Sequence, residues 1–105
     1  MPIYSLDFLL ANTRLWDRVR GQLNPRQEKA LSRLMHAGVD GFVGGLSASK
    51  YMALTGAPPA TAGRDLMHLV ELGALRRTGQ LKGTRYWLPH AKVGRDGGTE
   101  LGDEP

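Results

Sequence analysis

Histidine, cysteine and carboxylate side chains supply much of the catalytic and metal-binding chemistry of proteins, and this sequence does not group them. Its three histidines are His36, His68 and His90, each in a different part of the chain, and cysteine is absent. A zinc site needs ligands at short, defined spacings, and the candidate carboxylates do not provide them: Asp17, Glu28, Asp40, Asp65 and Glu71. We therefore expect no metal, no cofactor and no catalytic residue. Asp65 is better explained as the partner of a nearby arginine, or as a first-turn residue stabilised by a helix dipole.

Basic side chains are in excess, and the excess lies in the body of the chain. Fourteen lysines and arginines against ten acidic residues give a net charge of +4. Residues 1–54 carry +7 and −4, residues 55–88 carry +5 and −2, and residues 89–105 carry +2 and −4. A modest positive balance favours polyanionic partners such as nucleic acid, but it also fits a merely solvated basic surface.

Length and composition indicate one compact, soluble domain. The chain has 105 residues, of which 41% are hydrophobic, enough for a single core and far from the composition of a disordered protein. The lack of cysteine gives no sign of an oxidising compartment. Residues 1–10 have neither a basic leader nor the length of a membrane span. We expect a cytoplasmic protein without a signal peptide or a membrane anchor.

The first predicted helix covers residues 5–20, and its apolar residues lie on more than one face. At helical spacing, one face collects Phe8, Leu9, Leu15, Trp16 and Val19. Leu6 and Leu10 lie off that face. This helix therefore has either two stray leucines or a second neighbour outside the domain.

Three further helices are predicted from their end signals. The second begins after Asn24, with Pro25 at its first position and Gln27 completing a capping box, and it ends at Gly38. A loop with a short extended piece follows, containing the apolar residues Phe42, Val43 and Leu46. Ser47 opens a third helix over residues 48–55, and Gly56 ends it. Pro59 starts a fourth helix that runs to Leu72 before Gly73. Two short helices joined by a glycine turn are typical of a helix-turn-helix.

A β-hairpin is predicted after the fourth helix. Residues 74–78 and 84–88 are strand candidates, and the turn Gly79-Gln80-Leu81-Lys82-Gly83 joins them. This turn leads into a strand, so it is not a phosphate-binding loop of the kind that precedes a helix. The predicted fold is mainly α with a small β-hairpin, a winged helix-turn-helix preceded by an extra N-terminal helix. We divide the chain into an N-terminal helix and linker (1–22), the winged helix (23–88) and a mobile tail (89–105).

A series of short motifs accompanies these predicted elements. They are Leu23-Asn24-Pro25-Arg26-Gln27, Gly41-Phe42, Gly44-Gly45-Leu46-Ser47-Ala48, Lys50-Tyr51-Met52, Thr55-Gly56, Ala60-Thr61-Ala62, Arg64-Asp65-Leu66 and Gly73-Ala74-Leu75. Together they resemble the C-terminal winged-helix domain of Fic-family proteins (filamentation induced by cAMP), over residues 23 to about 88. In the preceding helix, Arg14-Leu15-Trp16 resembles the stretch that links the Fic catalytic domain to this module.

The resemblance implies a non-catalytic, adenylyltransferase-associated domain with a role such as transcription regulation in the bacterial cytoplasm. Fic catalytic domains typically transfer adenylate from ATP to a hydroxyl group of a target protein, with a loop of the form H-P-F-x-[DE]-G-N-G-R. That loop is absent from this sequence. The chain therefore resembles a fragment or a detached module of such a protein, and it inherits no catalytic residue.

Duplex DNA is the first partner that this fold and charge suggest. The second helix of a helix-turn-helix normally enters the major groove, while neighbouring cations contact phosphates. The predicted DNA-binding residues lie on the third helix, the fourth helix and the wing: Lys50, Thr61, Arg64, His68, Arg76, Arg77, Lys82 and Arg85.

Several residues count against this interpretation. Pro58 and Pro59 stand where the family usually has Ser-Arg, and they remove two backbone N–H donors from the helix start. Gly63 stands where the family usually has a threonine. Met67 and Glu71 lie on the outer face of the fourth helix, together with the predicted DNA contacts. The alternative is a protein-docking module, supported by the off-face leucines of the first helix, with three candidate partners: a Fic catalytic domain, its target protein or a second copy of the chain.

Overall fold

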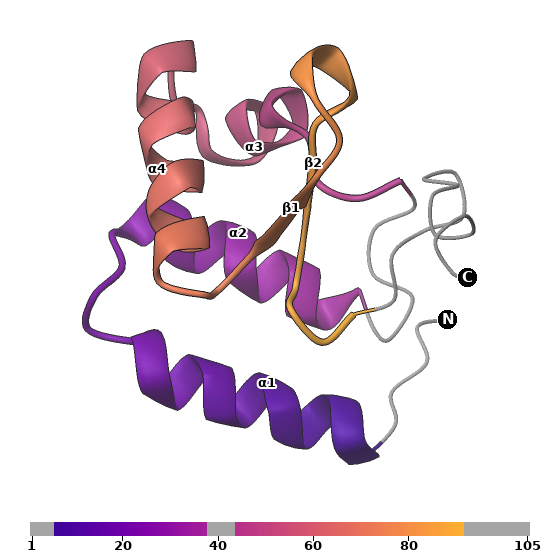
Figure 1. Cartoon of the computed structure of the whole chain (residues 1–105). Coiled ribbons are helices and arrows are strands. Elements are labelled where there is room, and N and C mark those ends of the chain that lie inside the picture. Colours follow the sequence, from indigo (N-terminus) through magenta and orange to yellow (C-terminus); the bar gives the residue numbers. More distant parts are fainter. Residues whose placement is uncertain (1–5, 38–43, 92–105) are drawn as a thin grey trace, which may run out of the picture.

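The computed structural model describes residues 6–37 and 44–91 of the chain (Figure 1). In these residues four helices precede an antiparallel hairpin. The elements are α1 (Leu6–Val19), α2 (Pro25–His36), α3 (Ala48–Thr55), α4 (Pro59–Glu71), β1 (Arg76–Thr78), a 3-10 turn η1 (Leu81–Gly83) and β2 (Arg85–Trp87). The predicted fold class is confirmed: a mainly helical winged helix-turn-helix preceded by an extra N-terminal helix. No helix in the described part of the chain is long and apolar enough to cross a membrane.

Reciprocal capping explains where α2 begins. The Asn24 side chain accepts a hydrogen bond from the Gln27 backbone N–H at 2.8 Å, and the Gln27 side chain accepts one from the Asn24 N–H at 2.9 Å. Pro25 occupies the first turn, where its missing N–H costs nothing. The predicted capping box is therefore formed.

The helix-turn-helix consists of α3 and α4, joined at Gly56. Ser47 caps α3 by accepting a hydrogen bond from the Lys50 N–H at 3.1 Å. Gly56 ends α3 with a φ of +77°, in the left-handed region that glycine adopts without a steric penalty. The start of α4 lacks such a cap, because Pro58 occupies the capping position and makes no side-chain bond. Both predicted helix starts, at Ala48 and Pro59, are confirmed.

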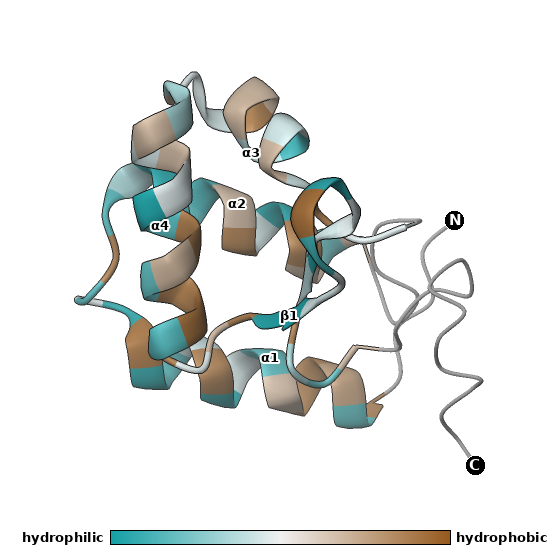
Figure 2. Ribbon diagram, turned by 45° about the horizontal axis from the view of Figure 1, so that its top comes forward, coloured by the Kyte–Doolittle hydropathy of each residue, from teal (hydrophilic) through white to brown (hydrophobic). Residues whose placement is uncertain are grey.

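One hydrophobic core joins the helices and the wing. Its buried members come from every helix and from Leu88 directly after β2, and they include Phe8, Leu15, Val19, Leu31, Leu34, Tyr51, Leu66, Leu69 and Leu88. The N-terminal helix α1 is packed into this core, and Arg18 Nη1 secures it by donating to the Leu72 carbonyl oxygen at 2.7 Å. Apolar and hydrophilic stretches alternate along α1 in Figure 2, as expected for a helix with one buried face. The prediction was wrong for Leu9, which is 45% exposed because it lies at the edge of that face.

The two strands of the hairpin form a small antiparallel sheet. β1 and β2 pair with Arg77 opposite Tyr86. Leu46 forms an antiparallel bridge to Tyr86, with N–H to carbonyl distances of 2.9 and 2.8 Å. The predicted extended piece before α3 is thus present at Leu46, whereas Phe42 and Val43 lie outside the described residues. The predicted mobile tail also lies outside them from residue 92 onward.

Candidate nucleic-acid interface

A buried carboxylate, Asp65, connects the middle of α4 to α2 and α3. Arg26 donates to both carboxylate oxygens, from Nε at 2.6 Å and from Nη2 at 3.1 Å. The Tyr51 hydroxyl donates at 2.7 Å, and Asn24 Nδ2 donates at 3.0 Å. The prediction that Asp65 pairs with an arginine is confirmed, and Arg26 is that arginine.

These partners keep Asp65 ionised. Burial by itself raises the pKa of the carboxyl group, but hydrogen bonds from Arg26, Tyr51 and Asn24 outweigh burial and hold the pKa of Asp65 below its usual value. Burial and the hydrogen bond to Asp65 raise the pKa of Tyr51. Because Arg26 neutralises the carboxylate within the domain, Asp65 does little to offset the positive charge of the surface.

The motif residues of α2 therefore have a structural role. Gln27 is buried, and its Nε2 donates to the Asp65 carbonyl oxygen at 3.0 Å and lies 3.0 Å from His68 Nδ1. An amide NH₂ group can only donate, so His68 Nδ1 is the acceptor of this hydrogen bond. His68, a predicted DNA contact, is exposed on α4 but held by α2, which leaves Nε2 as its remaining polar atom.

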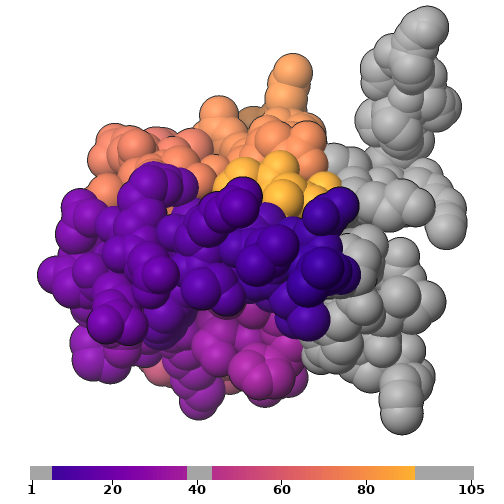
Figure 3. Space-filling model, turned by 90° about the horizontal axis from the view of Figure 1, so that it is seen from below, coloured from indigo at the N-terminus to yellow at the C-terminus, as the bar shows by residue number. Residues whose placement is uncertain are grey.

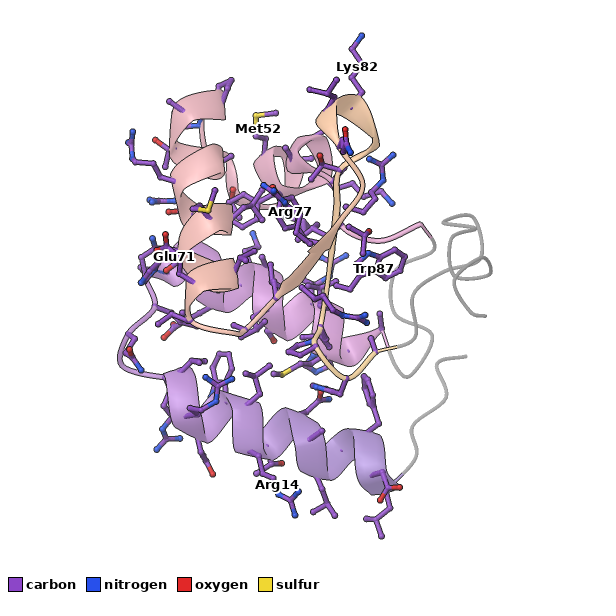
Figure 4. All side chains as sticks on the ribbon, viewed as in Figure 1. Arg14, Met52, Glu71, Arg77, Lys82 and Trp87 are labelled. Carbon is purple, nitrogen blue, oxygen red and sulfur yellow. The ribbon has the colours of Figure 1, made fainter. Side chains whose placement is uncertain are left out.

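The outer face of α4 is sparsely charged. Ala60, Arg64 and Met67 are exposed, Thr61 is partly buried, and Arg64 is the single lysine or arginine of the helix. Glu71 ends the helix seven residues after Arg64, which corresponds to roughly 10 Å along the axis. Figure 4 shows Glu71 on the part of α4 far from the wing tip, where Lys82 projects. Glu71, whose carboxylate would repel phosphate, is thus remote from the start of the helix.

A groove between the start of α3 and the wing brings three of the predicted residues together. It has a volume of about 580 Å³ and is lined by Ser47, Ala48, Ser49, Arg77, Leu81, Lys82, Thr84, Arg85 and Tyr86. We call it the wing groove. Its cations are Arg77, Lys82 and Arg85, and Arg77 and Tyr86 are directly opposed on the same face of the hairpin. Figure 4 shows Arg77 on the side of the wing that faces the helices.

The remaining predicted residues lie apart from the wing groove. Arg76 precedes Arg77 in the strand and therefore points to the other face of the hairpin, where its Nη2 donates to the Ala91 carbonyl oxygen at 3.1 Å. Lys50 is exposed on α3 but does not line the groove. Thr61, Arg64 and His68 belong to α4. The structure thus divides the predicted site into a wing cluster and a thinner α4 surface.

Sequence reasoning overlooked two parts of this surface. The polar lining of the groove includes Ser49 and Thr84, for which the sequence offers no local signal. Leu81 at the tip of the wing is 91% exposed, and an apolar residue in the middle of a glycine-bounded turn was a signal available in the sequence. Tyr86 also lines the groove, while the neighbouring Trp87 is buried.

Within the described residues no three histidine, cysteine or carboxylate side chains are close enough to hold a metal ion. The fold and the surface define a winged-helix domain with a basic wing. No protein-family model matches the chain, and no curated protein matches it either. The function is therefore inferred from the geometry and charge of the domain.

Proposed function

We propose that this chain is a non-catalytic winged-helix module of a Fic-family protein that binds duplex DNA in a regulatory role. One observation carries the DNA part of this proposal: Arg77, Lys82 and Arg85 line a single groove beside α3. Clustered lysine and arginine side chains contact phosphates, and such contacts position a protein on a duplex without reading its sequence.

The arrangement of the helices supports the same proposal. In Figure 1 the first turn of α4 and the tip of the wing lie at the same end of the molecule, with α3 between them and α1 at the opposite end. A duplex lying across that end would meet Arg64 on α4 and the cations of the wing groove together. The sequence from Leu72 to Ala91 contains no acidic residue, so nothing on the wing itself repels phosphate.

Fluorescence anisotropy with a short labelled duplex tests the proposal. We expect binding whose logarithmic affinity falls linearly with the logarithm of salt concentration, by about 0.9 for each phosphate neutralised. The double variant Arg77→Ala/Lys82→Ala removes two such contacts, so the slope should become shallower by about two.

A matched control removes the same charge from the opposite end of the molecule. Arg14 and Arg20 are exposed, and Figure 4 shows Arg14 pointing away from α1 into solvent. The variant Arg14→Ala/Arg20→Ala should keep the slope of the unaltered chain. Absence of salt-sensitive binding, or equal effects of the two double variants, would overturn the proposal.

A second candidate function, protein docking through α1, is favoured by a separate observation. Leu6, Leu9 and Leu10 are 72%, 45% and 43% exposed, so three leucines of one helix face solvent. Figure 3 shows the face of the molecule that α1 crosses. Contiguous exposed apolar side chains are typical of interaction surfaces. The partner would be a Fic catalytic domain or its target protein.

Calorimetric titration of such a catalytic domain into the chain tests this alternative. We expect heat of binding that the double variant Leu6→Ser/Leu10→Ser abolishes while its unfolding midpoint is retained. Unchanged binding by that variant, or no binding by the unaltered chain, would remove the support for docking through α1.

A further inference from the structure

The tip of the wing presents a leucine to solvent in a constrained conformation. Leu81 is 91% exposed, more than any other large apolar residue of the described chain. Its φ is +51°, and it is the one non-glycine residue with a positive φ among residues 6–37 and 44–91. Such a conformation is unfavourable for a residue with a Cβ and persists where the surrounding structure imposes it, often at functional sites.

The surrounding turn imposes this conformation through local hydrogen bonds. The Gly83 N–H donates to the Gln80 carbonyl oxygen at 2.8 Å, and the Thr84 N–H donates to the Leu81 carbonyl oxygen at 3.1 Å. Arg85 Nη1 donates to the Lys82 and Thr84 carbonyl oxygens at 3.0 and 2.8 Å. These bonds close η1 into a compact turn with Leu81 on its outside.

Glycine at the base of the turn completes the constraint. Gly79 has a φ of +79°, and a Cβ at this position would collide with the Gly83 carbonyl group. The two arms of the hairpin can therefore approach closely only with glycine there. The tip is a narrow, preorganised point that carries one apolar side chain.

The charges around Leu81 indicate what this point contacts. Lys82 follows it directly, and Arg77 and Arg85 line the same groove as Leu81. An apolar side chain with cations on the same groove fits an apolar slot bordered by anions. The minor groove of duplex DNA is such a place, since apolar wedges enter between base steps there while lysine and arginine contact the flanking phosphates.

The widths of the DNA grooves, and the small apolar surface of a single leucine, favour duplex DNA over an anionic lipid surface. The minor groove is only about 6 Å wide, too narrow for a helix but accessible to a single side chain on a turn, whereas the major groove is about 12 Å wide and admits a helix such as α4. An anionic lipid surface would also attract the cations, but stable insertion there requires the apolar face of a whole helix or an acyl chain rather than one leucine.

We propose that Leu81 is a wedge that enters the minor groove of duplex DNA, with Lys82 on the adjacent phosphate. This inference rests on the proposed function, because it assigns a contact to the wing of a DNA-binding module. It adds a mode of contact, intercalation of an apolar side chain, that the basic cluster alone does not imply.

The variant Leu81→Ala tests the contribution of the wedge independently of the phosphate contacts. We expect its affinity for the duplex to fall about tenfold, because the wedge is lost. The salt slope should stay unchanged, because no charge is removed, whereas Lys82→Ala should flatten it by about 0.9. With fluorophores at the two duplex ends, the unaltered chain should raise the energy transfer by kinking the DNA, and Leu81→Ala should not.

The control is Leu10→Ala, which shortens an exposed leucine on α1 and should leave affinity and energy transfer unchanged. Leu81→Ala should also keep the unfolding midpoint, since Leu81 packs against nothing in the core. Equal affinity and equal energy transfer for Leu81→Ala and the unaltered chain would overturn the wedge and leave the proposed function standing.

Two other outcomes would overturn the inference in different ways. If the unaltered chain shows no salt-sensitive binding to the duplex, the proposed function fails and the wedge fails with it. If Leu81→Ala reduces binding to phosphatidylserine vesicles but not to the duplex, the wing tip is a membrane contact instead.

Discussion

Replacing Asp65 with alanine should destabilise the domain strongly, although this residue touches no proposed ligand. The variant removes the acceptor of four hydrogen bonds, two from Arg26, one from Tyr51 and one from Asn24. The largest effect comes from Tyr51, which has no exposed surface, so that its hydroxyl would remain buried without an acceptor.

The magnitude follows from burial. An unsatisfied buried hydroxyl costs about 1–3 kcal/mol, and loss of the hydrogen bonds to the charged group adds about 1 kcal/mol. Arg26 can turn into solvent, since 39% of its side chain is already exposed, and it adds little. We expect a loss of about 3 kcal/mol from a total of roughly 5–15 kcal/mol. The thermal midpoint should fall by about 12–24 °C for a domain of this size.

Urea unfolding followed by circular dichroism measures the loss. The control is Asp17→Ala, because Asp17 is 66% exposed and lies 4.0 Å from Arg20 in a surface pair. Such a pair is worth about 0.5 kcal/mol or less. Tyr51→Phe should cost about 1 kcal/mol, since it removes the donor and the need for an acceptor together. A loss below about 1 kcal/mol for Asp65→Ala, or equal losses for Asp65→Ala and Asp17→Ala, would refute this account of the network.

Three further predictions concern residues outside the Asp65 network. His90 Nε2 lies 2.6 Å from Asn12 Oδ1, and partial burial lowers the pKa of His90. The unfolded chain therefore binds a proton at this residue more readily than the folded chain does. The stability contribution of neutral His90 should be complete above pH about 6.5 and be lost as the pH falls through its lower folded pKa. Urea unfolding between about pH 5 and pH 8 checks this, and His90→Gln should flatten the curve; an equally steep curve would contradict the assignment. Gly45→Ala should cost about 2–3 kcal/mol, because φ is +79° and the new Cβ would lie 2.9 Å from the Trp87 ring. Gly63→Ala should instead stabilise α4 by about 0.5–1 kcal/mol, because nothing lies within 4 Å of a Cβ at this position. Urea unfolding measures both glycine variants.

The helix boundaries were predictable because their causes are local. Asn24 and Ser47 each cap the amide three residues ahead, and Gly56 ends a helix through its own φ. These interactions depend on neighbours in the sequence. The exposed position of Leu9 was missed because a residue at the edge of an apolar face is buried or exposed according to what packs beside it.

The proposed site was only partly predictable for a related reason. Its cations were identified from composition and from the expected wing, and Arg77, Lys82 and Arg85 do meet in one groove. Arg76 was grouped with them, but its Nη2 donates to the Ala91 carbonyl oxygen, away from the groove. Strand alternation alone could not have separated them, because Arg85 pairs with Thr78 on the same face as Arg76 and still lines the groove.

The sequence by itself determined the order of the elements and the basic character of the wing, because capping, periodicity and charge act within short stretches of chain. Only the tertiary structure decided which residues are structural. Arg26 and Asp65 are 39 residues apart and meet because α2 and α4 pack together. The same packing holds His68 against Gln27, and the assembled hairpin leaves Leu81 exposed at the wing tip. Such contacts depend on how the helices and the hairpin assemble, which no local pattern records.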